Sequence, residues 1–359
     1  YPWTGGAGWL AYYVYDLYLF TQDRDYLLQH VVPVLKEVAA FYEDFLQKYP
    51  SHNGRVVFYP SISPENTPVM TPASQSTNVV PNATGEISIC REAVTHLIEA
   101  CNRLNIEQDS IPRWQALLSR LPDYVINADG ALAEWAYPGL GDKYNHRHSS
   151  HLYAIYPSLE ISPERTPDLF KAARTAMEKR LEAGLGGDSA HGLMHISLIA
   201  ARLKNADLLW QMLTDFAGLP FLNTSFITCH NPGPRIYNLD ATFSMPAVMM
   251  EMLLYSEPGL VELLPALPIK QFNRGTLSGA LARGGIVVEQ LHWNKTLNRV
   301  DVTLRSTQAQ TIQLRFGIDL RFVNAADPQD RSRVSSAKQR GTWHIDLPAN
   351  RALRLECRM

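Results

Sequence analysis

The sequence predicts a mainly helical protein, in which a barrel of helices is followed by a small antiparallel β-domain. Three observations carry this prediction. Apolar residues recur at helical spacing through most of residues 1–264, long loops rich in Pro, Gly, Asn and Ser separate these stretches, and short alternating segments take over in residues 265–359. We therefore expect two domains that divide after residue 264, with a functional site in the long loops at one mouth of the barrel.

The helical segments of the first domain follow one another along the chain. Residues 10–20 carry Leu10, Leu17 and Phe20 at helical spacing. A second helix is expected over residues 25–48, where Pro33 indicates a kink or a later start. Further helices are expected over residues 87–104, 110–119, 167–181, 191–203, 206–216 and 246–255, the last of which opens on Pro246.

Short, partly alternating segments in the second domain predict strands. They lie at residues 285–289, 300–304, 311–315 and 352–356. A turn is expected at residues 294–296, between the first two of them. These segments hold few residues suited to chemistry, so the second domain is interpreted as a structural domain that packs on the first.

Composition excludes several classes of partner. The formal net charge of −2 gives no general attraction to nucleic acid or to anionic lipid. No apolar run approaches the roughly 18 to 20 residues that a membrane span needs. The four cysteines form no C-x-x-C pair, which argues against a zinc ribbon and favours buried thiols.

No metal or cofactor is expected. The sequence has no P-loop, and no G-x-G-x-x-G fingerprint follows a predicted strand. His191 and His195 have the i, i+4 spacing of helical zinc ligands, but no glutamate lies between them. We interpret both as histidines that are hydrogen-bonded within the fold or that line a pocket wall; a metal site is the alternative.

The first candidate for chemistry is Glu65, in the segment Y-P-S-I-S-P-E-N-T-P of residues 59–68. Prolines fix the backbone of this loop on either side of the carboxyl group. A carboxyl group on a stiff loop beside apolar side chains such as Ile62 suits a general acid. The alternative interpretation is that Glu65 caps a helix or simply faces solvent.

The second candidate is the basic run H-R-H-S-S-H over residues 146–151. Sugar hydroxyls need hydrogen-bonding partners at several angles, and imidazole and guanidinium groups provide them. Arg147 opposes a metal ion between His146 and His148, because its charge is fixed and positive. We favour a polar substrate pocket; a structural hydrogen-bonded cluster and a metal site are the alternatives.

The third candidate is Asp240, in the segment Y-N-L-D-A-T-F of residues 237–243. It precedes an apolar helix, so it is either the N-cap of that helix or a carboxylate at the mouth of the barrel. The two roles do not exclude each other.

Several of these segments, in the same order, resemble glycoside hydrolase family 95. The similar segments are W-T-G-G-A followed by F-T-Q-D, P-S-I-S-P-E-N, the run from His146 to Pro157, and L-L-P-A-L-P followed by A-R-G-G. The resemblance implies an (α/α)6 barrel that is incomplete at its N-terminus, followed by an antiparallel β-sandwich. It also implies an exo-acting, inverting α-L-fucosidase that removes terminal L-fucose, α-1,2-linked by expectation, from glycans.

The resemblance also implies roles for individual residues. Glu65 falls at the position of the general acid, and Asp240 at that of the carboxylate that activates water. In an inverting enzyme two such carboxyl groups stand about 6.5 to 9.5 Å apart. The residues that fall where the family binds or borders the sugar, or that we expect beside them, are Arg147, His148, His146, Trp3 and Asn66.

Departures from the family pattern leave two alternatives open. The asparagines that position water in the family lie upstream of this chain, which starts at Tyr1 without Met, so we expect a fragment that is a poor or inactive catalyst. Beside Asp240, Ala241 stands in place of a smaller residue and Thr242 in place of an amide residue. The first alternative is therefore a carbohydrate-binding relative that has lost turnover. The family has tryptophans in the stretch that corresponds to residues 189–195, and this chain has none there. The second alternative is therefore an α-L-galactosidase. The compartment is not determined by the sequence; the resemblance favours a periplasmic or secreted protein over a cytoplasmic one.

Overall fold

The computed structural model describes residues 3–47, 49, 51–70, 77–184, 189–218, 221–222, 228–231 and 236–359. The chain divides into two compact units, each described here by itself. Unit 1 comprises Tyr1–Tyr18 and Asp23–His195, and unit 2 comprises Leu19–Gln22 and Ile196–Met359.

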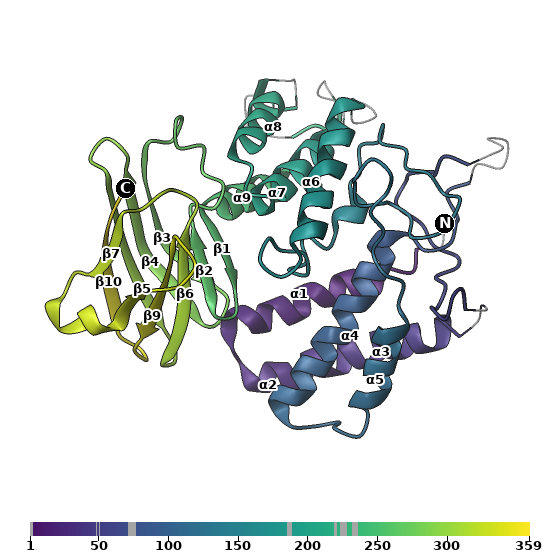
Figure 1. Ribbon diagram of the computed structural model, residues 1–359, viewed down its shortest axis with the longest axis horizontal. Coiled ribbons are helices and arrows are strands. Elements are labelled where there is room, and N and C mark those ends of the chain that lie inside the picture. The colour runs from purple at the N-terminus through teal and green to yellow at the C-terminus, as the bar shows by residue number, and fades with distance from the viewer. Residues whose placement is uncertain are drawn as a thin grey trace. The chain divides into compact units, whose positions relative to one another are not determined.

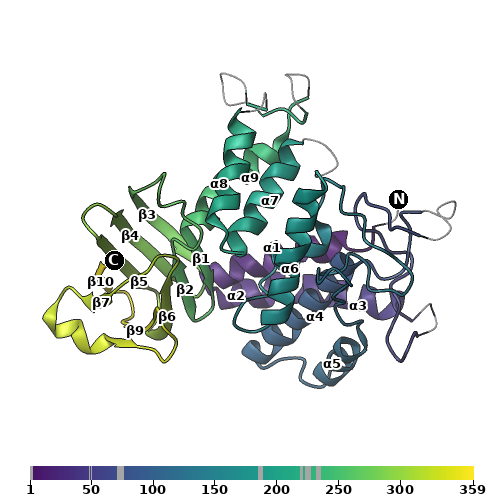
Figure 2. The ribbon, with the colours of Figure 1, turned by 45° about the horizontal axis from the view of Figure 1, so that its top comes forward.

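Unit 1 is helical, and its helices are joined by long loops. Its elements are α1 (Gly6–Thr21, whose last turn belongs to unit 2), α2 (Arg24–Tyr26), the π-helical turn η1 (Leu27–Val31), α3 (Val32–Phe45), α4 (Thr84–Leu104), α5 (Ile111–Arg120), the 3₁₀ turn η3 (Ser150–Leu152) and α6 (Pro167–Glu182). Helix α4 is the central one, because it packs against both α3 and α5 (Figures 1 and 2).

Helix α1 forms where the apolar spacing predicts it, but it buries a different face. Leu10 and Leu17 are exposed, whereas Tyr12 and Tyr15 are buried. The Tyr15 ring stacks on that of His96 in α4 at 4.0 Å, and its hydroxyl donates to Glu99 Oε2 at 3.0 Å. A tyrosine can bury its ring and still form a hydrogen bond through its hydroxyl group. The buried face of α1 is therefore formed by tyrosines rather than by these leucines.

The helix expected over residues 25–48 contains a π-helical turn between α2 and α3, and α3 ends at Phe45. The backbone stays right-handed helical at Leu27, Val31 and Val32, so the chain remains helical through this turn. Pro33 directly follows the π-helical turn, in the first turn of α3. The later start that Pro33 indicated is therefore not what the structure has.

Unit 2 contains the last helices and all named strands. Its elements are α7 (Ala190–Arg202, which begins in unit 1), α8 (Ala206–Gly218), α9 (Leu239–Leu253), β1 (Leu254–Glu257), β2 (Leu260–Leu263), β3 (Arg274–Ala282), β4 (Ile286–Asn294), β5 (Arg299–Ser306), β6 (Gln310–Phe316), β7 (Phe322–Ala325), the 3₁₀ turn η4 (Pro328–Arg333), β8 (Val334–Ser336), β9 (Thr342–Leu347) and β10 (Ala352–Arg358). The Arg202 guanidinium joins α7 to α9 by donating to both carboxylate oxygens of Glu251, at 2.5 and 2.9 Å.

The expected start of the last helix at Pro246 is wrong. Helix α9 begins at Leu239, and Pro246 lies inside it. Its N-cap is Asn238, whose Oδ1 accepts the Ala241 amide at 2.7 Å. The interpretation of Asp240 as N-cap is therefore also wrong, because Asp240 belongs to the first helical turn.

The β-domain consists of two five-stranded sheets, seen as two layers in Figure 1. Their strand orders are β1-β2-β6-β9-β8 and β3-β4-β5-β10-β7. Alternating side chains of β4, β5 and β10 are buried, as in a sheet with one face on a core. Each of the four strands predicted from the sequence overlaps a strand of the structure.

One feature of the β-domain differs from the expectation. The pairing of β2 with β6 is parallel, whereas the other strand pairs are antiparallel. The first strand begins at Leu254, and the division of the domains after residue 264 stays a prediction. The four cysteines are free and buried, as predicted. Within the described ranges, no helix is long and apolar enough to cross a membrane.

Candidate active site

The loop that carries Glu65 is held by buried polar side chains on both sides of it. Ser61 and Val80 exchange two backbone hydrogen bonds, at 3.0 and 3.1 Å. Ser63 Oγ donates to Glu134 Oε1 at 2.6 Å, and Asn66 Nδ2 donates to Glu134 Oε2 at 2.8 Å. The stiffness that the sequence attributes to prolines therefore also comes from hydrogen bonds to one buried carboxylate.

Glu65 itself points to solvent, with 64% of its side chain exposed. Its Oε2 is ion-paired with Arg147 Nη2 and lies 3.6 Å from His148 Nε2. The apolar flank expected from the sequence is turned inward, since Ile62 is buried. The structure thus brings together three residues of the predicted site.

The basic run folds under this loop, and two close backbone contacts hold it there. Ser150 Oγ donates to the carbonyl oxygen of Pro64 at 3.2 Å. The backbone oxygen of Ser150 comes so close to Gly85 in α4 that a Cβ there would stand 2.7 Å from it. A Cβ added to Gly192, at the start of α7, would stand 3.1 Å from the backbone oxygen of Arg147. The approach of the run therefore requires glycine at position 85 and favours it at position 192.

The histidines of the run are held as neutral imidazoles. Burial, followed by the neighbouring His148, lowers the pKa of His146 to about 3. The pKa of His148 is lowered to about 4, mainly by burial and to a lesser extent by electrostatic repulsion from His191. His148 Nδ1 lies 3.4 Å from His191 Nε2, so one of these nitrogens carries the proton between them. Neutral imidazoles both donate and accept, as binding of sugar hydroxyls requires.

His146 is buried, and its ring lies 5.2 Å from that of His148. Its Nε2 has no hydrogen-bond partner among the residues that the structure describes. Asn66 is also buried, but its amide is fully used: it donates to Glu134 and to the Lys143 carbonyl, and its Oδ1 accepts the Thr67 amide. Asn66 thus fixes the conformation of the loop, and its role in substrate binding stays a prediction.

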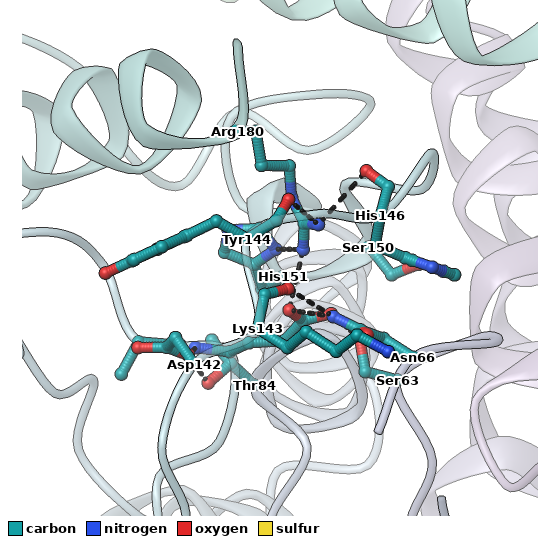
Figure 3. A network of polar contacts seen from close by, with 12 residues as sticks. Ser63, Asn66, Thr84, Asp142, Lys143, Tyr144, His146, Ser150, His151 and Arg180 are labelled. Carbon is teal, nitrogen blue, oxygen red and sulfur yellow. Dashed lines mark hydrogen bonds and ion pairs between the residues drawn. The ribbon is translucent and has the colours of Figure 1, made fainter. Parts of the chain in front are cut away.

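Arg180 in α6 pairs with Glu134 beneath the run. Arg180 Nη2 lies 2.6 Å from Glu134 Oε2, and the exposed fractions of the two side chains are 1% and 3%. Arg180 Nη1 donates to the backbone oxygens of Tyr144 and His146, each at 3.3 Å. Figure 3 shows the labelled members of this network, with Arg180 at the top, His146 and His151 near its guanidinium group, and Asn66 and Ser63 further below.

Glu86 in α4 performs a similar task for the segment that carries Trp3. Thr4 Oγ1 donates to Glu86 Oε2 at 2.7 Å, and the Ile62 amide donates to Glu86 Oε1 at 3.4 Å. Burial raises the pKa of Glu86 to about 7. Trp3 itself is partly exposed, and its ring meets that of Trp9 edge-on at 5.7 Å.

Asp240 belongs to unit 2 and is exposed in the first turn of α9. Asn238 Nδ2 lies 3.5 Å from Asp240 Oδ2 and 3.2 Å from His230 Nδ1. Thr242 Oγ1 is hydrogen-bonded to Thr228 Oγ1 at 2.8 Å. Because Glu65 lies in unit 1, the separation of the two carboxyl groups stays a prediction.

Sequence reasoning missed Glu134, Arg180 and Glu86. Glu134 stands in the apolar stretch A-L-A-E-W-A, and a lone carboxyl in such a stretch is a signal for a buried, paired charge. Arg180 gives no such signal, because it follows Glu178 and Lys179 and resembles an exposed helical residue. Within the described part of the chain, no group of three or more His, Cys, Asp or Glu is arranged to hold a metal ion.

Comparison with known proteins identifies similar sequences. The profile of the glycosyl hydrolase family 95 catalytic domain matches residues 1–253, and that of the family 95 C-terminal domain matches residues 255–347. The chain is 31% identical over 320 residues to Alpha-L-fucosidase 2 of Arabidopsis thaliana, a match covering 85% of this chain and 36% of that protein. It is 26% identical over 314 residues to Probable alpha-fucosidase A of Aspergillus niger, covering 82% and 38%. The chain thus spans little more than a third of these curated relatives.

Among solved structures, the chain is similar to a putative kojibiose phosphorylase from the human microbiome. The TM-score is 0.51 at 11% sequence identity, and the match covers 97% of this chain and 46% of that one. At this level of identity the likeness concerns the fold alone.

Proposed function

Because this chain belongs to glycoside hydrolase family 95, we propose that it carries the acid and the base of an inverting exo-α-L-fucosidase that releases terminal, α-1,2-linked L-fucose. The observation that carries the proposal is the exposed carboxyl group of Glu65, held on a stiff loop beside Arg147 and His148. The names of the two curated relatives support fucose as the sugar.

In the proposed mechanism Glu65 protonates the departing glycosidic oxygen. Arg147 and His148 bind hydroxyl groups of the sugar, and His146, whose ring lies 5.2 Å from that of His148, borders them from the buried side. Asp240 accepts a proton from the attacking water. A water that enters opposite the leaving group inverts the anomeric carbon. Trp3, which is partly exposed, borders the sugar.

Entry of the sugar changes the partner of Arg147. In the structure its guanidinium is paired with Glu65, and a bound sugar hydroxyl competes for the same N–H groups. Loosening of this pair leaves the Glu65 carboxyl group free to take up and deliver a proton.

One observation favours a second candidate, α-L-galactosidase activity on the same scaffold. The start of α7, where the family has tryptophans and this chain has none, packs against the backbone of Arg147 through Gly192. The wall beside the sugar therefore differs from the family pattern. L-galactose adds one hydroxyl at C6, and a hydroxyl in an apolar subsite changes binding by only about 1 to 3 kcal/mol.

The experiment is hydrolysis by the full-length protein of an α-1,2-fucosylated oligosaccharide and, in parallel, of an α-L-galactoside. Release of fucose at the higher kcat/KM supports the proposal, and preference for the galactoside favours the second candidate. If neither sugar is released while calorimetry detects binding of the fucoside, the protein is a carbohydrate-binding relative without turnover.

A further inference from the structure

The segments that carry Glu65 and Arg147 meet at one buried carboxylate. Glu134 accepts the Ser63 hydroxyl at one oxygen and the Asn66 amide at the other, so it holds the loop two residues before Glu65 and one residue after it. Its own backbone amide donates to Asp142 Oδ1 at 2.6 Å. Glu134 therefore fixes the loop from inside unit 1.

Arg180 connects the same carboxylate to the basic run. Besides its ion pair with Glu134, it donates to the backbone oxygen of His146, the residue before Arg147. Its Nη2 also lies 3.4 Å from His151 Nδ1, and since arginine only donates, this nitrogen of His151 accepts. The chain of contacts thus runs from Ser63 and Asn66 through two buried charges to both ends of the run (Figure 3).

Stability alone does not explain this pair. Removing two charges from water costs several kcal/mol per ion, and an apolar pair of similar size is often as stable or more stable. Burial raises the pKa of Glu134, with the charge of Arg180 as the largest opposing effect. Arg180 Nε is buried and has no hydrogen-bond partner within the described residues. A pair with this penalty, located where two site segments meet, is better explained by the geometry that it imposes.

We propose that Glu134 and Arg180 are positioning residues, which set the distance between the Glu65 carboxyl group and the sugar-binding groups Arg147 and His148. The inference rests on the proposed function of Glu65 as general acid. Neither residue needs to touch the substrate. A displacement of about 1 Å at a reacting group can reduce the rate about 100-fold. A substitution at Glu134 or Arg180 that moves Glu65 by this much should therefore have a measurable effect on the rate.

The test compares two substrates that differ in how much they need an acid. In a natural α-1,2-fucoside the leaving group is a sugar alcohol oxygen, which must be protonated because an alkoxide is a poor leaving group. In 4-nitrophenyl α-L-fucoside the leaving group is 4-nitrophenolate, which is stable without protonation. In Glu134→Gln the side-chain oxygen can still accept from Asn66 and Arg180, and its amide N–H can turn to the Ser63 hydroxyl, which then accepts. The charge that pairs with Arg180 is lost, however, so we expect the loop and the run to be held less firmly. We expect kcat on the natural fucoside to fall about 100-fold, and kcat on the aryl fucoside to fall at least ten times less.

Controls separate positioning from loss of folded protein. Glu251→Gln removes a charge from the pair with Arg202 in unit 2 and is expected to change neither kcat once rates are divided by the folded fraction. Ser63→Ala removes one hydrogen bond and keeps the Glu134–Arg180 pair, so it serves if Glu134→Gln does not fold. It should show the same preference for the aryl substrate with a smaller loss.

The outcomes distinguish the two proposals. If the unchanged protein hydrolyses neither fucoside, the proposed function fails. If it hydrolyses both, and every folded variant loses activity equally on the two substrates, the positioning role is overturned and the pair only stabilises the fold. A Glu65→Gln variant that shares the aryl preference of Glu134→Gln links the pair to the acid.

Discussion

Arg180 and Glu134 form an ion pair of 2.6 Å inside unit 1, where both side chains are almost fully excluded from solvent. Through this pair the loop with Glu65 and the run with Arg147 are parts of one hydrogen-bonded network. The carboxyl group proposed for catalysis is exposed, but the parts that hold it are buried. Substitutions at the exposed groups and at the buried groups behind them should therefore have separable effects.

Replacement of Glu65 by glutamine should reduce kcat on a natural fucoside by about 10² to 10⁴-fold, since the amide cannot donate a proton to the leaving group. Binding of the substrate, measured by calorimetry, should change little. Glu178→Gln, a change on the exposed side of α6, is the matched control and should retain full activity. A Glu65→Gln variant that keeps most of its activity on the natural glycan would show that the acid is elsewhere.

Arg147→Lys should raise KM about 10-fold while changing kcat less. Lysine keeps the positive charge, but it lacks the planar fork that can contact two hydroxyls, or Glu65, at fixed angles. Arg174→Lys makes the same exchange at an exposed position of α6 and should leave KM unchanged. Equal KM values in the two variants would mean that Arg147 does not bind the sugar.

Asn238 and Asp240 should have separable roles at the start of α9. Asn238→Ala removes the N-cap hydrogen bond to the Ala241 amide and should lower the free energy of unfolding by about 1 kcal/mol. Asp240→Asn should leave that free energy nearly unchanged but reduce kcat at least about 100-fold, because an amide cannot activate water. Urea unfolding and steady-state kinetics measure the two effects. A loss of stability in Asp240→Asn equal to that in Asn238→Ala would speak for a structural carboxylate instead.

Glu86→Gln should change how stability depends on pH. Below pH about 4.5 the carboxyl group is protonated in both states, whereas between pH 4.5 and 7 only the folded state retains the proton, because burial raises the pKa of Glu86 to about 7. The wild-type free energy of unfolding therefore falls over this range by about 3 kcal/mol relative to the variant. Urea unfolding of both proteins at several pH values tests this. A difference that stays constant from pH 4 to pH 8 would contradict it.

The fold was largely predictable because its elements carry periodic patterns. The helices at residues 167–181 and 206–216 and the strands of the β-domain follow from the spacing of apolar residues alone. The errors occurred where local signals compete. Pro246 is a frequent first helical residue, but the Asn238 cap starts α9 a full seven residues earlier than the expected helix, at Leu239.

The candidate site was predictable where a motif marks it and not where packing forms it. Glu65, Arg147 and His148 stand in unusual segments, and the structure brings them together. Glu134 and Arg180 lie 46 positions apart in the sequence, and only the fold reveals that they meet. Residues that hold a site carry ordinary local sequence, because their function consists in a contact across the chain.

The most direct test of the central claim is a proton NMR time course of hydrolysis of an α-1,2-linked fucoside by the full-length protein. An inverting α-L-fucosidase releases β-L-fucose first, and the α-anomer follows only as the free sugar equilibrates. We predict this order for the wild-type protein and no early β-L-fucose for Glu65→Gln. Initial release of α-L-fucose, or release that is unaffected by Glu65→Gln, would contradict the assignment of Glu65 as the general acid of an inverting glycosidase.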